Sequence, residues 1–326
     1  MKTKQCCIPL ESPKEWKEAL SGIKHTFGNT WENCYAMYLT TGLKTYLYFF
    51  EEDNARVVCP ISEREFAGYV DIVKPYGFSG FVGNGFCPGF RLNWQEFVRE
   101  RGYVCGYLGL NPIFDCSDHF DPAEIYKYDI VYLLDLTLSY DELFANMHRN
   151  RREQLRNWND VKPDFICDKA LLQEFFLDNY YNFLREKNAS SFYSFSKETF
   201  SFLFSLDNVL LVGIRESGKV VAVSVFTYTD NAGDCAFIVS LPGVRNQSSA
   251  LVWYGVNYLK SLGIPVLNLG GGGGGVSEFK RRFGCKELPL RCQKQVYKHD
   301  VYEMLCRQIN ADPKDMAGYF PAYRKG

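Results

Sequence analysis

Six consecutive glycines, Gly270 to Gly275, are the residues of this sequence best suited to holding a charged ligand. They follow residues 266–269, whose alternation predicts a strand, and precede residues 276–283, whose apolar spacing predicts a short helix. A strand–glycine loop–helix unit brings backbone N–H groups close to a ligand because no Cβ intervenes, and the helix dipole adds positive potential there. The pattern predicts a site for a negative or developing-negative oxygen, and a merely flexible loop is the alternative.

Lys280 is the candidate catalytic side chain next to this loop. It follows Phe279 at the edge of the apolar face of the predicted helix, so its ammonium need not be fully solvated. The alternative is that Lys280, Arg281 and Arg282 form an ordinary solvated basic run. The loop is neither a Walker A loop, because the Lys–Ser/Thr pair is missing, nor a Rossmann fingerprint, because no acidic residue ends a following strand at the expected distance.

Arg151 is a candidate phosphate ligand on a second predicted helix. That helix starts at a capping box, Ser139 and Glu142, and extends to about residue 158. Arg151 falls inside its apolar stripe, where a guanidinium must reach the surface or bind a carboxylate or phosphate. Three more arginines line a neighbouring face: Arg149, Arg152 and Arg156. A solvated basic face is the alternative for the whole group.

The segment of residues 69–83 combines Pro75 and three glycines with aromatic side chains. It predicts either an aromatic loop packed on a core or a cleft wall that presents the Tyr76 hydroxyl. A general base for proton transfer is not identified by the sequence; Tyr76, Asp71 and Glu278 are candidates, each with a structural alternative.

Composition limits the class of protein. The chain has 326 residues, 46% of them hydrophobic, which is enough for one large or two ordinary domains. A net charge of −1 provides no overall field for DNA or membranes, so an anion site must be local. The twelve cysteines and four histidines have no metal-ligand spacing, so we expect no metal. Without an apolar run of 18 residues or an N-terminal signal, we expect a cytoplasmic protein with reduced thiols.

The predicted elements are those of an α/β protein with mixed sheets and two domains, residues 1–138 and 139–326. The first half is predicted to contain helices at residues 13–25 and 91–102 and strands at residues 34–40, 43–50, 55–61, 103–110 and 129–137. The second half is predicted to contain strands at residues 163–167, 209–214, 220–228, 235–240, 266–269 and 288–293, with helices at residues 171–187, 197–206, 250–262 and 300–309. The aromatic C-terminal tail is expected to dock on the body.

The order of elements in the second half resembles the GNAT acyltransferase domain. In that family, the loop before the central helix binds the pyrophosphate of acyl-CoA through an Arg/Gln-x-x-Gly-x-Gly/Ala pattern. The matching residues are Arg245, Asn246, Gln247, Ser248, Ser249 and Ala250. Ser248 replaces the first glycine of the pattern, although N–H groups at a helix N-terminus still suit an anion.

A further resemblance covers most of the chain and is to the Fem-type peptidyltransferases and related GNAT-like acyltransferases of cell-surface polysaccharide pathways. It is carried, in order, by the segments YGFSGFVG, NMHRNRREQLRNW, FLREKNASSFYSFSKETF and LNLGGG…FKRRFG. Those proteins have two tandem GNAT-like domains, the first degenerate. The resemblance implies that Phe279 and Lys280 lie in the active site, that Lys280 stabilises charge during transfer, and that Arg185 helps to bind acceptor phosphates.

The resemblance implies an N-acyltransferase that uses acyl-CoA, such as acetyl-CoA, to modify an amino group. The expected acceptor is a sugar nucleotide, a lipid-linked saccharide or a peptide of cell-envelope biogenesis. One alternative is Fem-type transfer of an aminoacyl group from tRNA, although the near-zero net charge provides no broad basic surface for tRNA. Another is a double-GNAT protein that binds a ligand without catalysis. Gly270, Gly271 and Gly272 are expected to contact the donor.

Two geometric expectations test this interpretation. The strands of residues 235–240 and 266–269 should be parallel neighbours joined by a right-handed crossover through the helix of residues 250–262, with a cleft where they separate. Tyr76 should face the same interdomain cleft as Arg151 and Arg185.

Overall fold

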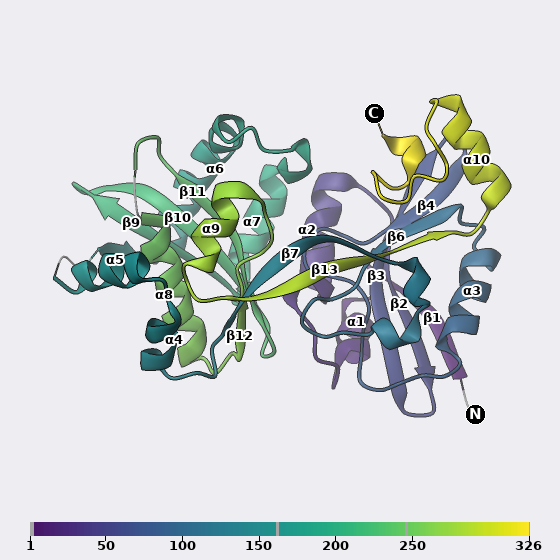
Figure 1. The fold of residues 1–326 in the computed structure, drawn as a ribbon, viewed down its shortest axis with the longest axis horizontal. Helices are drawn as coiled ribbons and strands as arrows, with labels where there is room; N and C mark the ends of the chain where they lie inside the picture. The colour runs from purple at the N-terminus through teal and green to yellow at the C-terminus, as the bar shows by residue number, and fades with distance from the viewer. Residues whose placement is uncertain (1–2, 161–162, 245–246, 326) are drawn as a thin grey trace. The chain divides into compact units, whose positions relative to one another are not determined.

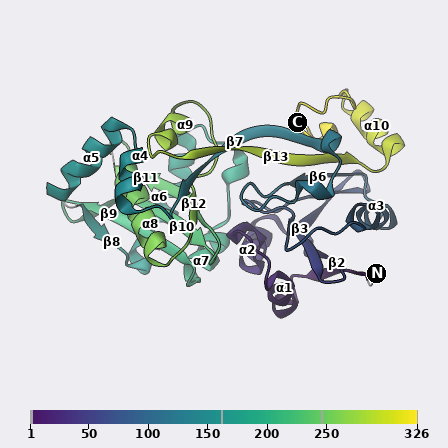
Figure 2. The same cartoon turned by 60° about the horizontal axis from the view of Figure 1, so that its bottom comes forward.

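The computed structural model describes residues 3–160, 163–244 and 247–325, with only the backbone of residues 157–160. The chain forms two compact units, each described by itself below (Figure 1, Figure 2). Unit 1 contains the chain up to Asp129 and again from Pro289 onward, and unit 2 contains Ile130–Leu288. Among the described residues, no helix has the length and apolarity needed to span a membrane.

Unit 1 is built on a mixed sheet with an aromatic core. Its strands are β1 (Thr3–Pro9), β2 (Thr45–Glu52), β3 (Ala55–Phe66), β4 (Tyr69–Val73), β5 (Val82–Gly83), β6 (Cys105–Gly109) and β13 (Lys286–Val296), and its helices are α1 (Pro13–Leu20), α2 (Trp31–Thr41), α3 (Phe90–Glu100) and α10 (His299–Gln308). The strand order is β1-β2-β3-β4-β6-β13, with β4 and β6 parallel. Tyr48, Phe81, Phe90 and Trp94 make edge-to-face contacts in the core, as their abundance in the sequence favoured.

The C-terminal segment packs on unit 1, which confirms that the tail docks on the body. β13 pairs with β6, and Tyr302, Leu305 and Tyr323 pack against Val104 and Cys105. The expected domains assigned residues 289–326 to the second half, so the observed units divide the chain differently. The reason is a contact between segments that are distant in sequence. Residues 289–326 supply a paired strand and apolar side chains to elements that lie about 200 residues before them in the chain.

Unit 2 contains the predicted glycine loop and a set of strands that pair in both parallel and antiparallel directions. Its strands are β7 (Ile125–Asp135), β8 (Asp164–Ile166), β9 (Val209–Glu216), β10 (Lys219–Tyr228), β11 (Gly233–Ser240) and β12 (Val266–Asn268), and its helices are α4 (Tyr140–Asn146), α5 (Arg149–Asp160), α6 (Lys169–Glu186), α7 (Lys197–Ser205), α8 (Gln247–Ser261) and α9 (Gly274–Arg281). The strand order is β7-β12-β11-β10-β9-β8. The predicted meander of residues 209–240 is confirmed as β9, β10 and β11, which pair antiparallel in sequence.

Residues 34–40 form part of helix α2, so the prediction of a strand there is wrong. The Thr30 side chain accepts the Asn33 N–H at 3.2 Å and caps the helix, and Gly42 ends it in the left-handed region at φ 62°. Asn33, Cys34 and Met37 are buried with helical spacing. The segment resembled a strand because it contains two tyrosines, Tyr35 and Tyr38, and tyrosine is enriched in strands.

The single helix predicted from Ser139 to residue 158 is two helices, α4 and α5. Its predicted capping box is confirmed, but the backbone is extended at Met147. His148 N–H donates to Arg282 O at 3.0 Å, and a Cβ on Gly284 would lie 2.5 Å from Asn146 O. The helix is interrupted here because these residues pack on residues 282–284, which are distant in sequence. Arg152 donates to the Ala145 and Met147 carbonyls, both at 2.8 Å, and is therefore a helix-capping residue.

Candidate functional site

The site is organised by the parallel strands β11 and β12. They pair only at Gly233 with Leu267 and at Asp234 with Asn268, while β11 continues to Ser240. This confirms the predicted parallel arrangement, and α8 is the helix that connects the two strands. The carboxyl ends of parallel strands are where α/β sheets bind ligands. Here β11 leads to the N-terminus of α8 and β12 leads directly into the glycine loop.

The glycine loop is held by side chains on both sides. Gly270 N–H donates to Asn268 Oδ1 at 2.8 Å, the Lys280 ammonium donates to Gly271 O, and the Ser277 hydroxyl donates to Gly272 O. Gly272 has φ 126°, which excludes most other residues. The Gly270 N–H is thus occupied by Asn268, so the oxyanion donors that we expect in this loop are those of Gly271 to Gly273.

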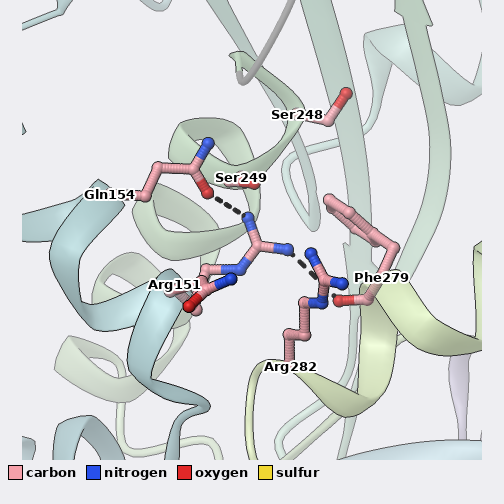
Figure 3. A pocket seen from close by; sticks show the side chains of 7 residues that line it. Arg151, Gln154, Ser248, Ser249, Phe279 and Arg282 are labelled. Atoms are coloured by element: carbon pink, nitrogen blue, oxygen red, sulfur yellow. Dashed lines mark hydrogen bonds between the residues drawn. The ribbon is translucent and has the colours of Figure 1, made fainter.

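A cavity of about 280 Å³ opens between α5, α8 and α9. Figure 3 shows side chains from these three helices converging on it. It is lined by Asn150, Arg151, Gln154, Ser248, Ser249, Phe279 and Arg282. Two guanidinium groups and the first turn of a 15-residue helix therefore surround one space, which favours an anion there.

Arg151 is the central cation of this cavity. Only 4% of the residue is exposed, and its guanidinium carbon lies 4.7 Å from the Phe279 ring centroid and 4.2 Å from that of Phe283. Its Nη1 donates to Gln154 at 2.6 Å and its Nη2 to Phe279 O at 3.3 Å (Figure 3). Its buried Nε has no hydrogen-bond partner in the structure. Burial lowers the pKa of Arg151 to about 10, so it remains charged at neutral pH.

The residues matched to the pyrophosphate pattern have different positions. Arg245 and Asn246 lie outside the described residues. Gln247 begins α8 and donates to Glu216, and Ser248 and Ser249 line the cavity. Ala250 is buried in the core of unit 2, and its contact with the donor stays a prediction. A cavity residue that the pattern did not include is Arg282, whose Nε also donates to Glu278 at 2.9 Å.

Comparison with solved structures finds proteins with a similar fold. FemX matches with 10% identity and a TM-score of 0.69, over 93% of this chain and 99% of FemX. The chain has the tandem GNAT-like fold. The chain also matches the C-terminal domain of a putative lysylphosphatidylglycerol synthetase from Agrobacterium fabrum, with 15% identity and a TM-score of 0.58, over 91% of this chain and 96% of that one. It matches L-PGS from Bacillus licheniformis with 14% identity and a TM-score of 0.57, over 88% of this chain and 92% of that one. No protein-family model and no curated protein matches the chain. The predicted fold class, two tandem GNAT-like domains with mixed α/β sheets, is confirmed.

The other two predicted site residues belong to different units. Arg185, near the end of α6, is exposed, bonds to Asn182 and is not among the residues that line the cavity. Tyr76 belongs to unit 1. A side-chain hydrogen bond holds its loop, because Asn33 Nδ2 donates to Tyr76 O at 2.8 Å. The catalytic role of Tyr76 and the substrate-binding role of Arg185 stay predictions.

Two candidate bases have structural partners instead. Asp71 is buried and accepts hydrogen bonds from Arg64, Tyr323 and Arg324. Glu278 is exposed and pairs with Arg282. Each of these two carboxylates thus has an arginine partner that fixes its position in the fold.

Asp234 and Asn268 are buried polar residues of the GNAT-like unit that sequence reasoning did not select. Asn268 Nδ2 donates to Asp234 Oδ1 at 2.9 Å. Burial raises the pKa of Asp234 to about 7, and the Asn268 amide acts in the opposite direction. The predicted strand began at residue 235, so the prediction left out Asp234, which lies inside β11. The available signal was a polar residue, Asn268, in the otherwise apolar strand before the glycines.

Proposed function

We propose that the protein is an N-acyltransferase that moves an acyl group from acyl-CoA to an amino group of a cell-surface saccharide or peptide precursor. The observation that carries this proposal is the cavity at the carboxyl end of β11, where Arg151, Arg282 and the first turn of α8 face one space. The unpartnered, buried Arg151 Nε supports an anionic ligand, since a buried donor without an acceptor is costly. In this proposal the CoA diphosphate binds here and its acyl arm extends between β11 and β12.

The proposed chemistry is direct transfer. A neutral amine attacks the thioester carbonyl, and the resulting oxyanion is stabilised by Lys280 and by N–H groups of Gly271 to Gly273. A covalent cysteine intermediate is disfavoured, because burial raises the pKa of Cys235 to about 11 and that of Cys285 to about 12. Thiols with such values contain almost no thiolate, the nucleophilic form, at neutral pH.

A second candidate is transfer of an aminoacyl group from tRNA. It is favoured by the similarity of the fold to FemX and by Ser248, which replaces the expected first glycine of the pyrophosphate loop. Both donors, acyl-CoA and aminoacyl-tRNA, fit the proposal of a cytoplasmic transferase. Ligand binding without catalysis is the remaining alternative.

A thermal-shift panel separates these functions, because a ligand of the native state raises its apparent stability. The ligands are CoA, acetyl-CoA, UDP-linked amino sugars and aminoacyl-tRNA analogues. We expect acetyl-CoA and CoA to raise Tm. Stabilisation by nucleotide sugars or aminoacyl-tRNA analogues alone would favour the Fem-type candidate, and stabilisation without any transfer product would favour a binding protein.

We expect Arg151→Ala to weaken CoA binding by roughly 10- to 100-fold, the value of one or two charge-assisted hydrogen bonds. The dependence of Kd on salt should also become shallower, because one screened charge is lost. Titration calorimetry at two salt concentrations measures both effects. Arg149→Ala is the matched control, since Arg149 is on the same helix but exposed and paired with Glu153. Equal Kd values and equal salt slopes for the two variants would remove Arg151 from the site.

A further inference from the structure

We propose that Asp234, oriented by Asn268, is the proton acceptor that deprotonates the attacking amine. This inference rests on the proposed acyl transfer. It adds the general base that the sequence left unidentified, whereas the candidates Asp71 and Glu278 have arginine partners.

The first argument is the fixed geometry of the pair. Asn268 is fully buried and uses both ends of its amide: Nδ2 donates to Asp234 Oδ1 at 2.9 Å, and Oδ1 accepts the Gly270 N–H at 2.8 Å. The carboxylate is therefore connected, through one side chain, to the start of the glycine loop. Burying a charged carboxylate costs free energy unless a cation pairs with it, and here the hydrogen-bond donor is a neutral amide.

The second argument is the position of Asp234 at the vertex of the separating strands. It is the last β11 residue that pairs with β12. The other end of β11 leads along the chain to α8, whose Ser248 and Ser249 line the cavity. Asp234 and Ser240 are separated by six strand positions, or about 20 Å at roughly 3.3 Å per residue. An extended pantetheine arm has a similar length. A donor with its diphosphate at α8 and its arm along β11 therefore brings its acyl group near Asp234.

The third argument is electrostatic. The neighbouring elements place four residues next to β11: Thr227, Asn268, Leu259 and Tyr180. Of these only Tyr180 ionises, and its hydroxyl donates to Tyr193 O at 2.6 Å. The Cys235 thiol interacts electrostatically with both Asp234 and Lys280. A base with a pKa of about 7 is well matched to a reaction near neutral pH.

The step balances without another reactant. The amine nitrogen forms a bond to the acyl carbon, and one amine proton passes to an Asp234 carboxylate oxygen. The carbon–sulfur bond then breaks, the electron pair leaves with the CoA sulfur, and the thiolate takes up a proton. The products are an amide and CoA, and Asp234 returns its proton to solvent.

The test compares wild type, Asp234→Asn and a matched control, Asp230→Asn, which changes an exposed residue in the turn before β11. Acetyl-CoA is the donor, and UDP-linked amino sugars and lysine peptides are the acceptors. We expect wild-type kcat/KM to rise with pH through about 7, the pKa of Asp234. Asp234→Asn should lower kcat by about 10²-fold and abolish this rise, while CoA still raises its Tm. Asp230→Asn should match wild type.

Measuring Tm against pH tests the titration of Asp234 without requiring enzymatic activity. Because burial raises the folded-state pKa of Asp234, its stabilising contribution is complete below about pH 4 and is lost as the pH rises to about 7. The Tm of Asp234→Asn should therefore exceed that of wild type by an amount that grows from pH 4 to 7 and is constant above.

Three results would overturn the assignment. An unchanged pH profile in an active Asp234→Asn variant leaves the proposed function intact and removes Asp234 from it. Equal Tm values for that variant and wild type across this pH range contradict the buried, titrating carboxylate. Absence of transfer from acetyl-CoA to any amine by wild type removes the proposed function and this inference with it.

Discussion

Lys280→Ala should lower kcat and kcat/KM together, by 10²- to 10³-fold, and leave the Tm increase caused by CoA unchanged. The side chain lies one residue after Phe279, which lines the cavity, and its ammonium donates to Gly271 O of the loop that follows β12. In the proposed reaction this ammonium stabilises an oxyanion that exists only during transfer, so its removal should raise the activation barrier by roughly 2.7–4 kcal/mol. Steady-state kinetics with acetyl-CoA measures the effect.

Two variants separate charge stabilisation from maintenance of the loop. Ser277→Ala removes the other side chain that donates to the loop, at Gly272 O, without removing a charge. Arg281→Ala removes a charge that is exposed and paired with Glu287. We expect less than about tenfold loss for either and incomplete rescue by Lys280→Arg, because a planar guanidinium does not replace a compact ammonium. Similar losses in all variants would mean that Lys280 only supports the loop; Arg282 is not a suitable control because it lines the cavity.

Asp71→Ala should destabilise unit 1 by about 3–5 kcal/mol, the usual cost of removing one partner from a buried ion pair. The Asp71 side chain is fully buried, and its oxygens accept from Arg64 at 2.7 Å, Tyr323 at 2.9 Å and Arg324 at 2.6 Å. Without the carboxylate, two largely buried guanidinium groups lose their common counter-charge. The free energy of unfolding in urea measures the loss, and faster proteolysis near Tyr323 should accompany it, since the tail loses its attachment to β4.

Glu303→Ala is the control for this prediction. Glu303 pairs with Arg307 on the exposed face of α10, and such surface pairs contribute at most about 1 kcal/mol. A loss of stability for Asp71→Ala as small as that of Glu303→Ala would show that the Asp71 cluster does not hold the tail.

Much of unit 2 was predictable because its signals are local. The glycines at residues 270–273 lie between an apolar strand and a short amphipathic helix, and the capping box of Ser139 and Glu142 is confirmed. The parallel pairing of β11 with β12 followed from the order of elements. One error occurred where distant contacts override local preference, because residues 282–284 break the predicted long helix at Met147. The other error was local, since the caps Thr30 and Gly42 enclose a helix where a strand was predicted.

Residue type and spacing were thus enough to locate the glycine loop, Lys280 and Arg151, because backbone freedom, apolar periodicity and an arginine within an apolar stripe are properties of a few neighbouring residues. The ionic state and partners of the polar residues were decided only by the folded chain. Asp71 is neutralised by Arg324, 253 residues away, whereas Asp234 is buried beside a neutral amide from another strand. Burial and charge pairing depend on which distant segments meet, so the sequence named Asp71 as a candidate base and passed over Asp234.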